Sequence, residues 1–104
     1  MLSFDILPIM EIEFNGKIIF WRGPSPFYFV AVPAKQSREI KAISKLATYG
    51  WGVIPVHVKI GKTEFTTSLF PKDGKYLVPI KVIVRKAEKI DKGDMVSVRL
   101  VVRL

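Results

Sequence analysis

The sequence predicts a mainly β domain with two short helices, built from an internal strand–helix–strand repeat within one chain. Three observations support this fold class. Short segments of alternating apolar and polar residues recur along the chain and are separated by turns that contain Gly or Pro. Two segments instead show apolar residues at spacings of three and four, which indicate amphipathic helices. Each of these two segments follows an apolar strand that runs into a proline, and each precedes an alternating strand.

Length and composition set the limits for the domain. With 104 residues, 49% of them hydrophobic, the chain is long enough for one core and too short for two. We expect an N-terminal arm, residues 1–10, and a single domain, residues 11–104. The sequence has no cysteine, which excludes disulfides and thiolate sites and is typical of a reducing, cytoplasmic setting. We expect no signal peptide and no membrane anchor, because no apolar run approaches the roughly 20 residues of a membrane span. The dominance of Lys and the scarcity of amides are typical of thermophile proteins.

Residues 11–21 are predicted to form one long strand, although Asn15-Gly16 is a strong hairpin signal. A two-residue turn there would place Phe14 opposite Lys17, so each face of the hairpin would mix charged with large apolar side chains. In a single strand the apolar residues all face one side, and Gly16 marks a bulge or a bend.

The first helix is predicted over residues 35–48. It follows a Pro-rich loop at 22–27 and an apolar strand at 27–32 that ends at Pro33. Its apolar residues form one stripe, its basic residues lie on the other side, and Gly50 ends it. The stripe consists of Ile40, Ile43, Leu46 and Ala47.

A hairpin follows the first helix. Apolar and polar residues alternate in the segments 53–60 and 63–70, and a Gly-Lys turn separates the two segments. A second turn at 71–75 then leads into a short strand at 76–79.

The second helix is predicted over residues 80–90, although Val82-Ile83-Val84 has the β-branched composition of a strand. In a strand, Ile83 would lie among cations, whereas in a helix that begins at Pro79 all the apolar residues share one face. The helix is therefore preferred, even though each β-branched residue costs a few tenths of a kcal/mol in helix propensity. The predicted apolar face consists of Ile80, Ile83, Val84, Ala87 and Ile90, and the predicted solvent face carries Lys81, Arg85 and Lys89.

The last strand, residues 95–104, completes an internal repeat. The segments FYFVAVP and YGWGVIPVHVKI flank the first helix as YLVPIKV and DKGDMVSVRLVV flank the second. The chain therefore reads as a tandem of one supersecondary unit. The residues of the last strand that we expect to face inward are Val96, Val98, Leu100 and Val102.

These segments also carry resemblances to known families. The region from Val78-Pro79 to Leu100 resembles the swapped-hairpin barrel of AbrB-type transition-state regulators and antitoxins. Over about residues 11–102, the segments FYFVAVP, YGWGVIPVHVKIG, TEFTTSLFPKDGKYLVPIKVIVRKAE and KGDMVSVRL are together similar to the domain-of-unknown-function family numbered nineteen hundred and five. Both resemblances imply a double-split β-barrel, with both halves here supplied by one chain. They imply no catalytic residue.

The formal charge of +8 favours a polyanionic partner, through the release of counterions. Residues 1–34 carry almost no net charge, so the positive charge belongs to the rest of the chain. We therefore expect a non-enzymatic nucleic-acid-associated or regulatory binding module that contacts DNA or RNA, although a solvated lysine surface explains the same charge. The candidate contacts are two helical stripes and two arginines of the last strand, namely Arg38, Lys41, Lys45, Lys81, Arg85, Lys89, Arg99 and Arg103.

Two alternatives remain open. The first is a small-molecule-binding protein or modest enzyme, whose pocket is lined by Trp21, Trp51 and Phe70 with Arg22 or Arg85 as anion anchor. The same rings also fit a purely structural role at the ends of a barrel. The second alternative is a protein–protein interaction module docked through the N-terminal arm.

The sequence supplies few groups for catalysis. It has one histidine and no Gly-rich phosphate loop, so we name no catalytic residue, metal ligand or cofactor. His57 lies between inward-facing valines and is expected to point outward, as an ordinary surface residue. Because both halves of the repeat lie in one chain, we expect a monomer able to fold. The apolar arm, residues 1–10, would pack on its own chain or add a strand to an edge, and it is the candidate for a weak dimer contact.

Overall fold

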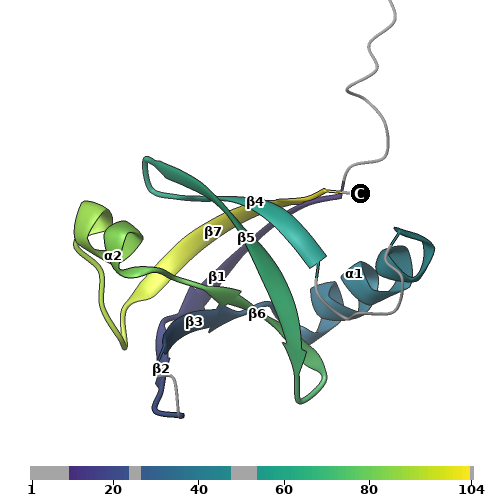
Figure 1. Cartoon of the computed structure of the whole chain (residues 1–104), viewed down its shortest axis with the longest axis horizontal. Helices are drawn as coiled ribbons and strands as arrows, with labels where there is room; N and C mark the ends of the chain where they lie inside the picture. The colour runs from purple at the N-terminus through teal and green to yellow at the C-terminus, as the bar shows by residue number, and fades with distance from the viewer. Residues whose placement is uncertain (1–9, 24–26, 48–53, 104) are drawn as a thin grey trace, which may run out of the picture.

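The computed structural model describes residues 10–23, 27–47 and 54–103, apart from the side chains of residues 45–47. These residues form a strongly curled antiparallel sheet with two helices, which confirms the predicted mainly β class (Figure 1). The strands are β1 (Glu11–Lys17), β2 (Ile19–Trp21), β3 (Phe27–Ala31), β4 (Ile54–Ile60), β5 (Thr63–Lys72), β6 (Lys75–Pro79) and β7 (Met95–Val102), and the helices are α1 (Ala34–Ala47) and α2 (Val82–Glu88).

The sheet curls because its two edge strands, β1 and β2, are consecutive in the chain. Its order is β1-β7-β4-β5-β6-β3-β2, and only Ile18 separates β1 from β2. Ile18 is itself tied to the turn before β7, because its amide donates to the carbonyl of Asp94 at 2.9 Å and its carbonyl accepts from the amide of Gly93 at 2.8 Å. The two ends of the strand order are therefore held together at this residue.

The segment 11–21 is a nearly continuous strand and makes no hairpin at Asn15-Gly16, as predicted. Asn15 lies opposite Ser97 in the β1–β7 pair, and the register continues through Gly16 without a bulge. The predicted bulge or bend at Gly16 is therefore wrong, since the break falls at Ile18. Gly16 serves close packing instead, because a Cβ atom on it would lie 2.5 Å from Cγ1 of Val30.

The strand–helix–strand order occurs twice, as β3–α1–β4 and β6–α2–β7, and the two units pair with each other. β3 pairs with β6, and β4 pairs with β7. The hydrogen bonds beyond β3 and β6 are reciprocal: Val32 donates to the carbonyl of Tyr76 at 2.8 Å, and Ile80 donates to the carbonyl of Tyr28 at 2.9 Å. The predicted repeat is thus accompanied by matching pairings in the structure.

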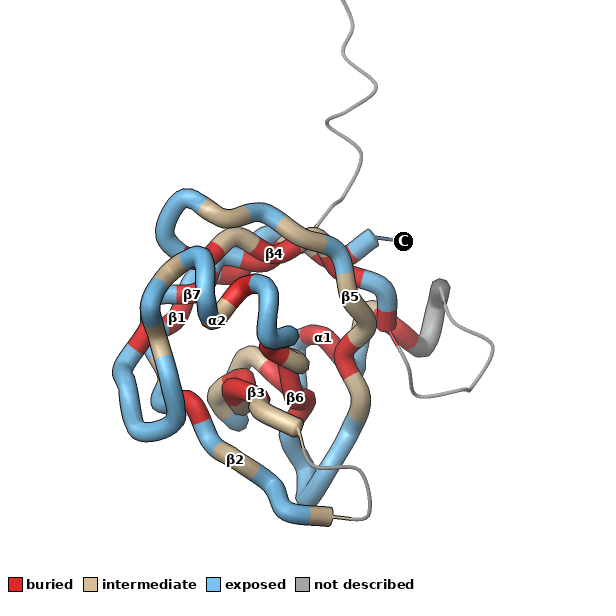
Figure 2. Tube along the Cα trace, turned by 60° about the vertical axis from the view of Figure 1, so that its left-hand side comes forward, coloured by how far each residue is buried: buried red, intermediate tan, exposed pale blue. Residues whose placement is uncertain are grey.

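The core lies inside the curl of the sheet (Figure 2). Alternation along β4 and β7 turns every second residue inward, as predicted from the sequence. The inward residues of these two strands are Ile54, Val56, Val58, Ile60, Val96, Val98, Leu100 and Val102, all buried. No helix in the described residues is long and apolar enough to cross a membrane.

Helix α2 confirms the choice of a helix over a strand, but its predicted buried face is partly wrong. Ile83 is 71% exposed and Ala87 is exposed, whereas Val84 is buried. The helix begins later and ends earlier than predicted, and its inward side carries Val84 with half-buried Arg85 and Glu88. Lys81 is still extended, with φ −71° and ψ 159°, so Ile80 belongs to the end of the strand rather than to the helix. The left-handed Lys89 then ends the helix after two turns, before Ile90 packs back against the core.

Candidate functional site

The cations of the two helices do not form one surface. α1 and α2 lie at opposite ends of the longest axis of the molecule (Figure 1). Each predicted basic stripe must therefore be considered by itself. The side chain of Lys45, in the α1 stripe, lies outside the described residues.

On α2, the central cation of the predicted stripe, Arg85, contacts neighbouring residues. The guanidinium carbon of Arg85 lies 3.5 Å from the centroid of the Tyr28 ring, and its Nε is 3.5 Å from the carbonyl oxygen of Ile80. Lys81 and Lys89 remain exposed at the two ends of the helix. A stacked, half-buried arginine between two separated lysines is a weaker anion site than the predicted row of three.

On α1, by contrast, the predicted cations line a cavity of about 440 Å³. The cavity lies between the first turns of α1 and the hairpin that joins β5 to β6. Arg38 and Lys41 come from the helix, and Lys72 and Lys75 come from the hairpin. We refer to this site as the basic cavity; the residues that line it are Ser37, Arg38, Lys41, Pro71, Lys72, Asp73, Gly74, Lys75 and Tyr76.

A buried serine fixes the helix against the hairpin. The hydroxyl of Ser37 donates to the carbonyl of Val32 at 3.0 Å and accepts from the amide of Tyr76 at 3.1 Å. These two bonds connect the start of α1 to β6, so the next helical turn, with Arg38 and Lys41, stays beside the hairpin. Ser37 is buried, and its hydroxyl acts as a structural link between the helix and β6.

The hairpin places two lysines opposite each other. Asp73 and Gly74 form its tip with φ values of 53° and 80°, the left-handed conformations of a tight two-residue turn. The register then sets Lys72 directly opposite Lys75. Like charges in this position destabilise a β pair. The single acid in the cavity, Asp73, is 3.9 Å from the Nζ of Lys72, so the basic cavity holds four cations and one carboxylate.

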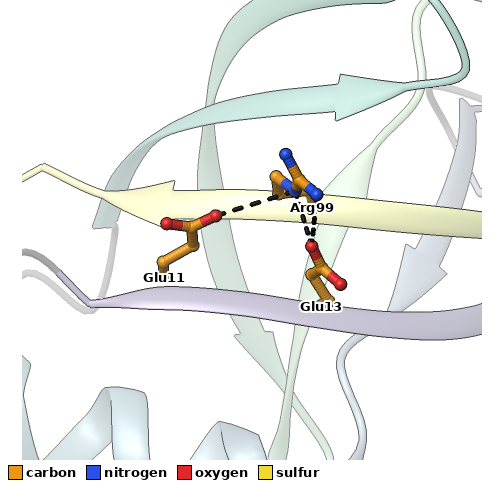
Figure 3. Close-up of polar contacts among 3 residues, drawn as sticks. All are labelled: Glu11, Glu13 and Arg99. Carbon is orange, nitrogen blue, oxygen red and sulfur yellow. Dashed lines mark hydrogen bonds and ion pairs between the residues drawn. The ribbon is translucent and has the colours of Figure 1, made fainter.

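The arginines predicted on the last strand do not join this cavity. Nη2 and Nε of Arg99 each lie 2.6 Å from Oε2 of Glu13, and Nε lies 3.6 Å from Oε2 of Glu11 (Figure 3). Two carboxylates of β1 thus offset the charge of Arg99. Arg103 is exposed just beyond β7.

A second cavity, of about 310 Å³, lies on the same outer face as Arg99. It is lined by Glu13, Lys59, Gly61, Ser97 and Arg99. The register of four neighbouring strands sets Glu13, Arg99, Lys59 and Glu64 in one row, with two acids outside and two bases between them. This row has no net charge, so it does not attract a polyanion as the basic cavity does.

The histidine next to this row is an outward-facing surface residue, as predicted. Nε2 of His57 lies 2.9 Å from Oε1 of Glu64, and both side chains are partly exposed. The hydrogen bond from His57 lowers the pKa of Glu64 below its ordinary value. The described residues contain no group of three or more acidic or histidine side chains placed to hold a metal ion.

Two of the aromatic residues predicted to line a pocket, Trp21 and Phe70, belong to a ring cluster, and neither lines the two cavities described above. The Phe27 ring contacts Trp21 and Phe70, at centroid distances of 5.4 and 5.5 Å. Arg22 is next to the Phe20 ring, with a distance of 5.8 Å from its guanidinium carbon to the ring centroid. Trp51 lies outside the described residues.

The sequence predicted two of the four cations that line the basic cavity. Arg38 and Lys41 carried the signal of a basic helical face, whereas Lys72 and Lys75 were assigned only to a turn. The PKDGK segment could have predicted these two lysines, because a two-residue Asp-Gly turn places the residues on either side of it opposite each other.

The chain matches a family of known sequences. The family model described as Domain of unknown function (DUF1905) matches residues 14–100, most of the chain. This match confirms the family resemblance seen in the sequence. No curated protein matches the sequence.

Proposed function

The chain belongs to the DUF1905 family, and we propose that this member is a non-enzymatic nucleic-acid-associated binding module. The phosphates of the nucleic acid bind in the basic cavity. The observation that carries the proposal is the convergence of Arg38 and Lys41 from α1 with Lys72 and Lys75 from the hairpin around one carboxylate.

Electrostatics favours this site over the other basic residues. Arg99 is paired with two glutamates and Arg85 is stacked on a ring, whereas the basic cavity keeps an excess of positive charge. Binding of a phosphate would offset the repulsion between Lys72 and Lys75, which the free protein retains. The net charge of +8 would add long-range attraction and counterion release.

The chemistry of the site supports binding rather than reaction. Lysine ammonium groups act as flexible point charges for phosphate, and Arg38 adds a planar donor fork. Such contacts hold the backbone of a nucleic acid without reading its sequence. We therefore expect sequence-independent affinity.

The finer fold assignment belongs to the same proposal. We infer that the curled sheet is a double-split β-barrel, because β3 pairs with β6 and β4 pairs with β7 within one chain. That architecture would relate the chain in fold to AbrB-type regulators, and the relation is an analogy of fold rather than of function.

The test is the salt dependence of binding to a labelled oligonucleotide. The double variant Arg38→Gln with Lys41→Gln should bind more weakly, and its log–log salt slope should fall by roughly 0.7 to 0.9 for each phosphate that the variant no longer neutralises. The control variant Lys17→Gln with Lys86→Gln removes the same charge from exposed positions outside the cavity. Equal decreases of slope in the two variants would assign binding to general charge and overturn the site, and the lack of any salt-dependent binding would overturn the function.

A small phosphorylated molecule is the second candidate, because a volume of about 440 Å³ is in the range of small-ligand sites. A competition experiment distinguishes a small phosphorylated ligand from a nucleic acid. Inorganic pyrophosphate at millimolar concentration should displace a small ligand completely. A longer oligonucleotide that contacts further cations should be displaced only in part.

A further inference from the structure

Cations gather around the rings of one strand pair. In the described part of the chain, four cations lie within 6 Å of an aromatic ring centroid, and the rings all belong to β2 and β3. The pairs are Arg22 with Phe20 at 5.8 Å, Lys92 with Phe20 at 5.9 Å, Lys72 with Trp21 at 5.5 Å, and Arg85 with Tyr28 at 3.5 Å.

The register of β2 and β3 distributes these rings over both faces of the pair. Phe20 lies opposite Tyr28, and Trp21 lies opposite Phe27. Each pair is in ring contact, at centroid distances of 4.8 and 5.4 Å. Trp21 is 41% exposed, with the Nζ of Lys72 over its ring and Gly23 packed close to the same ring.

The exposed ring adjoins the basic cavity. Lys72 lines the cavity and also places its Nζ 5.5 Å from the centroid of the Trp21 ring. A strand of nucleic acid whose phosphate contacts Lys72 would therefore carry its neighbouring base past Trp21. Base stacking on an exposed aromatic ring, next to cations that follow the backbone, is how single strands are held without sequence preference.

We propose that the ligand of this protein is single-stranded nucleic acid, with an unpaired base stacked on Trp21 and its phosphate in the basic cavity. This inference rests on the proposed function and adds the strandedness of the ligand. Duplex DNA cannot use the ring in this way, because its base faces are already stacked and only base edges are open in the grooves.

The experiment compares four labelled probes of equal length by fluorescence anisotropy with the full chain. The probes are an oligo-dT, an oligo-U, an abasic strand with the same phosphates, and a duplex. The wild-type protein should bind oligo-dT or oligo-U more tightly than the abasic strand by about 5-fold to 150-fold per stacked base. Because oligo-dT and oligo-U differ in the thymine methyl group as well as in the sugar, oligo-dU is measured as a control, and the preference between oligo-dU and oligo-U identifies DNA or RNA as the source of the unpaired base.

Variants of Trp21 then test whether the base stacks on this ring. Trp21→Leu should lower affinity for oligo-dT by about 5-fold or more and leave abasic binding unchanged, whereas Trp21→Phe should retain most of the affinity. Ile19→Ala is the matched control, since Ile19 lies on the same strand and is 42% exposed without a ring. The probe comparison needs no variant, so the inference stays testable if Trp21→Leu does not fold.

The outcomes separate the two proposals. Equal binding of the abasic strand and oligo-dT, or tighter binding of the duplex, would overturn base stacking and leave the phosphate site intact. Failure of all four probes to bind at low salt would overturn the proposed function as well.

Discussion

Lys72 lies directly opposite Lys75 at the end of the β5–β6 hairpin, with one turn of two residues between them. Two ammonium groups that face each other across a strand pair repel, whereas opposite charges there are worth about 0.2–1 kcal/mol. Lys75→Glu should therefore raise the free energy of unfolding while it weakens oligonucleotide binding. Thermal unfolding and anisotropy measure the two effects. Lys17→Glu, which carries the same charge change opposite Met95, should give neither the stabilisation nor the full decrease in binding.

Arg85 stabilises the docking of α2 through the face of Tyr28. A guanidinium 3.5 Å from a ring centroid is well placed for a cation–π contact, and lysine reproduces the charge without the planar stack. Arg85→Lys should lower the free energy of unfolding by about 0.5–1 kcal/mol in urea titrations. Lys86→Ala, on the same helix at an exposed position, should change it by less than about 0.5 kcal/mol. A destabilisation in Arg85→Lys no larger than in Lys86→Ala would show that the stacked arrangement adds nothing.

Substitutions at Gly61 and Glu88 should have coupled effects on stability, because the two residues are in close contact. Gly61 has φ +61°, and a Cβ atom on it would overlap Oε1 of Glu88. Gly61→Ala should therefore cost roughly 1–2 kcal/mol for the left-handed backbone, plus the displacement of the Glu88 carboxylate. In a Glu88→Ala background only the backbone cost remains, so Gly61→Ala should be less destabilising there. Equal costs in the two backgrounds, measured by urea unfolding, would exclude the steric coupling.

The stability of the protein should depend on pH through Glu88. The Thr63 hydroxyl donates to the Glu88 carboxylate at 2.5 Å and the Lys62 amide donates at 3.1 Å, and these bonds lower the pKa of Glu88 below its ordinary value of 4.5. The charged form is thus favoured in the folded state, so its contribution is complete above pH 4.5 and is lost as the pH falls through the lowered pKa. The difference in unfolding free energy between wild type and Glu88→Gln should therefore shrink below pH 4.5. A difference that is constant from about pH 3 to about pH 7 would contradict this assignment.

Local patterns sufficed for most of the fold. Alternation predicted the inward faces of β4 and β7. The helix α2 was predicted correctly, but Pro79 is the last residue of β6 and two residues of the predicted apolar face, Ile83 and Ala87, are exposed. What the pattern could not show was how early Lys89 would end that helix, because a left-handed residue other than Gly gives no clear sequence signal. Ile83 is exposed because α2 packs inward through Val84, with Arg85 and Glu88 half-buried beside it.

The candidate site depended on pairings that local spacing does not contain. Arg38 and Lys75 are far apart in the sequence, and the pairing of β3 with β6, together with the bond between Ser37 and Tyr76, brings them to one cavity. The pairing of Arg99, which removes it from the free cations, has the same origin. Glu13 and Arg99 were both placed outward by alternation, but only the β1–β7 register shows that they face each other.

The pairings between the two repeat units lead to the last prediction, that the chain is a monomer. Val30 of β3 lies opposite Val78 of β6, and Val58 of β4 lies opposite Leu100 of β7, and all four are fully buried. In a barrel assembled from two chains these contacts would cross a subunit interface, whereas here each unit finds its partner in the same chain. Light scattering coupled to size-exclusion chromatography should therefore give the monomer mass at micromolar concentration. The apolar segment 1–9 is outside the described residues and is the candidate for any weaker association. Such an association would raise the measured mass as the protein concentration increases. A dimer that persists on dilution and unfolds together with the core would show that the sheet is shared between chains and that closure within one chain is wrong.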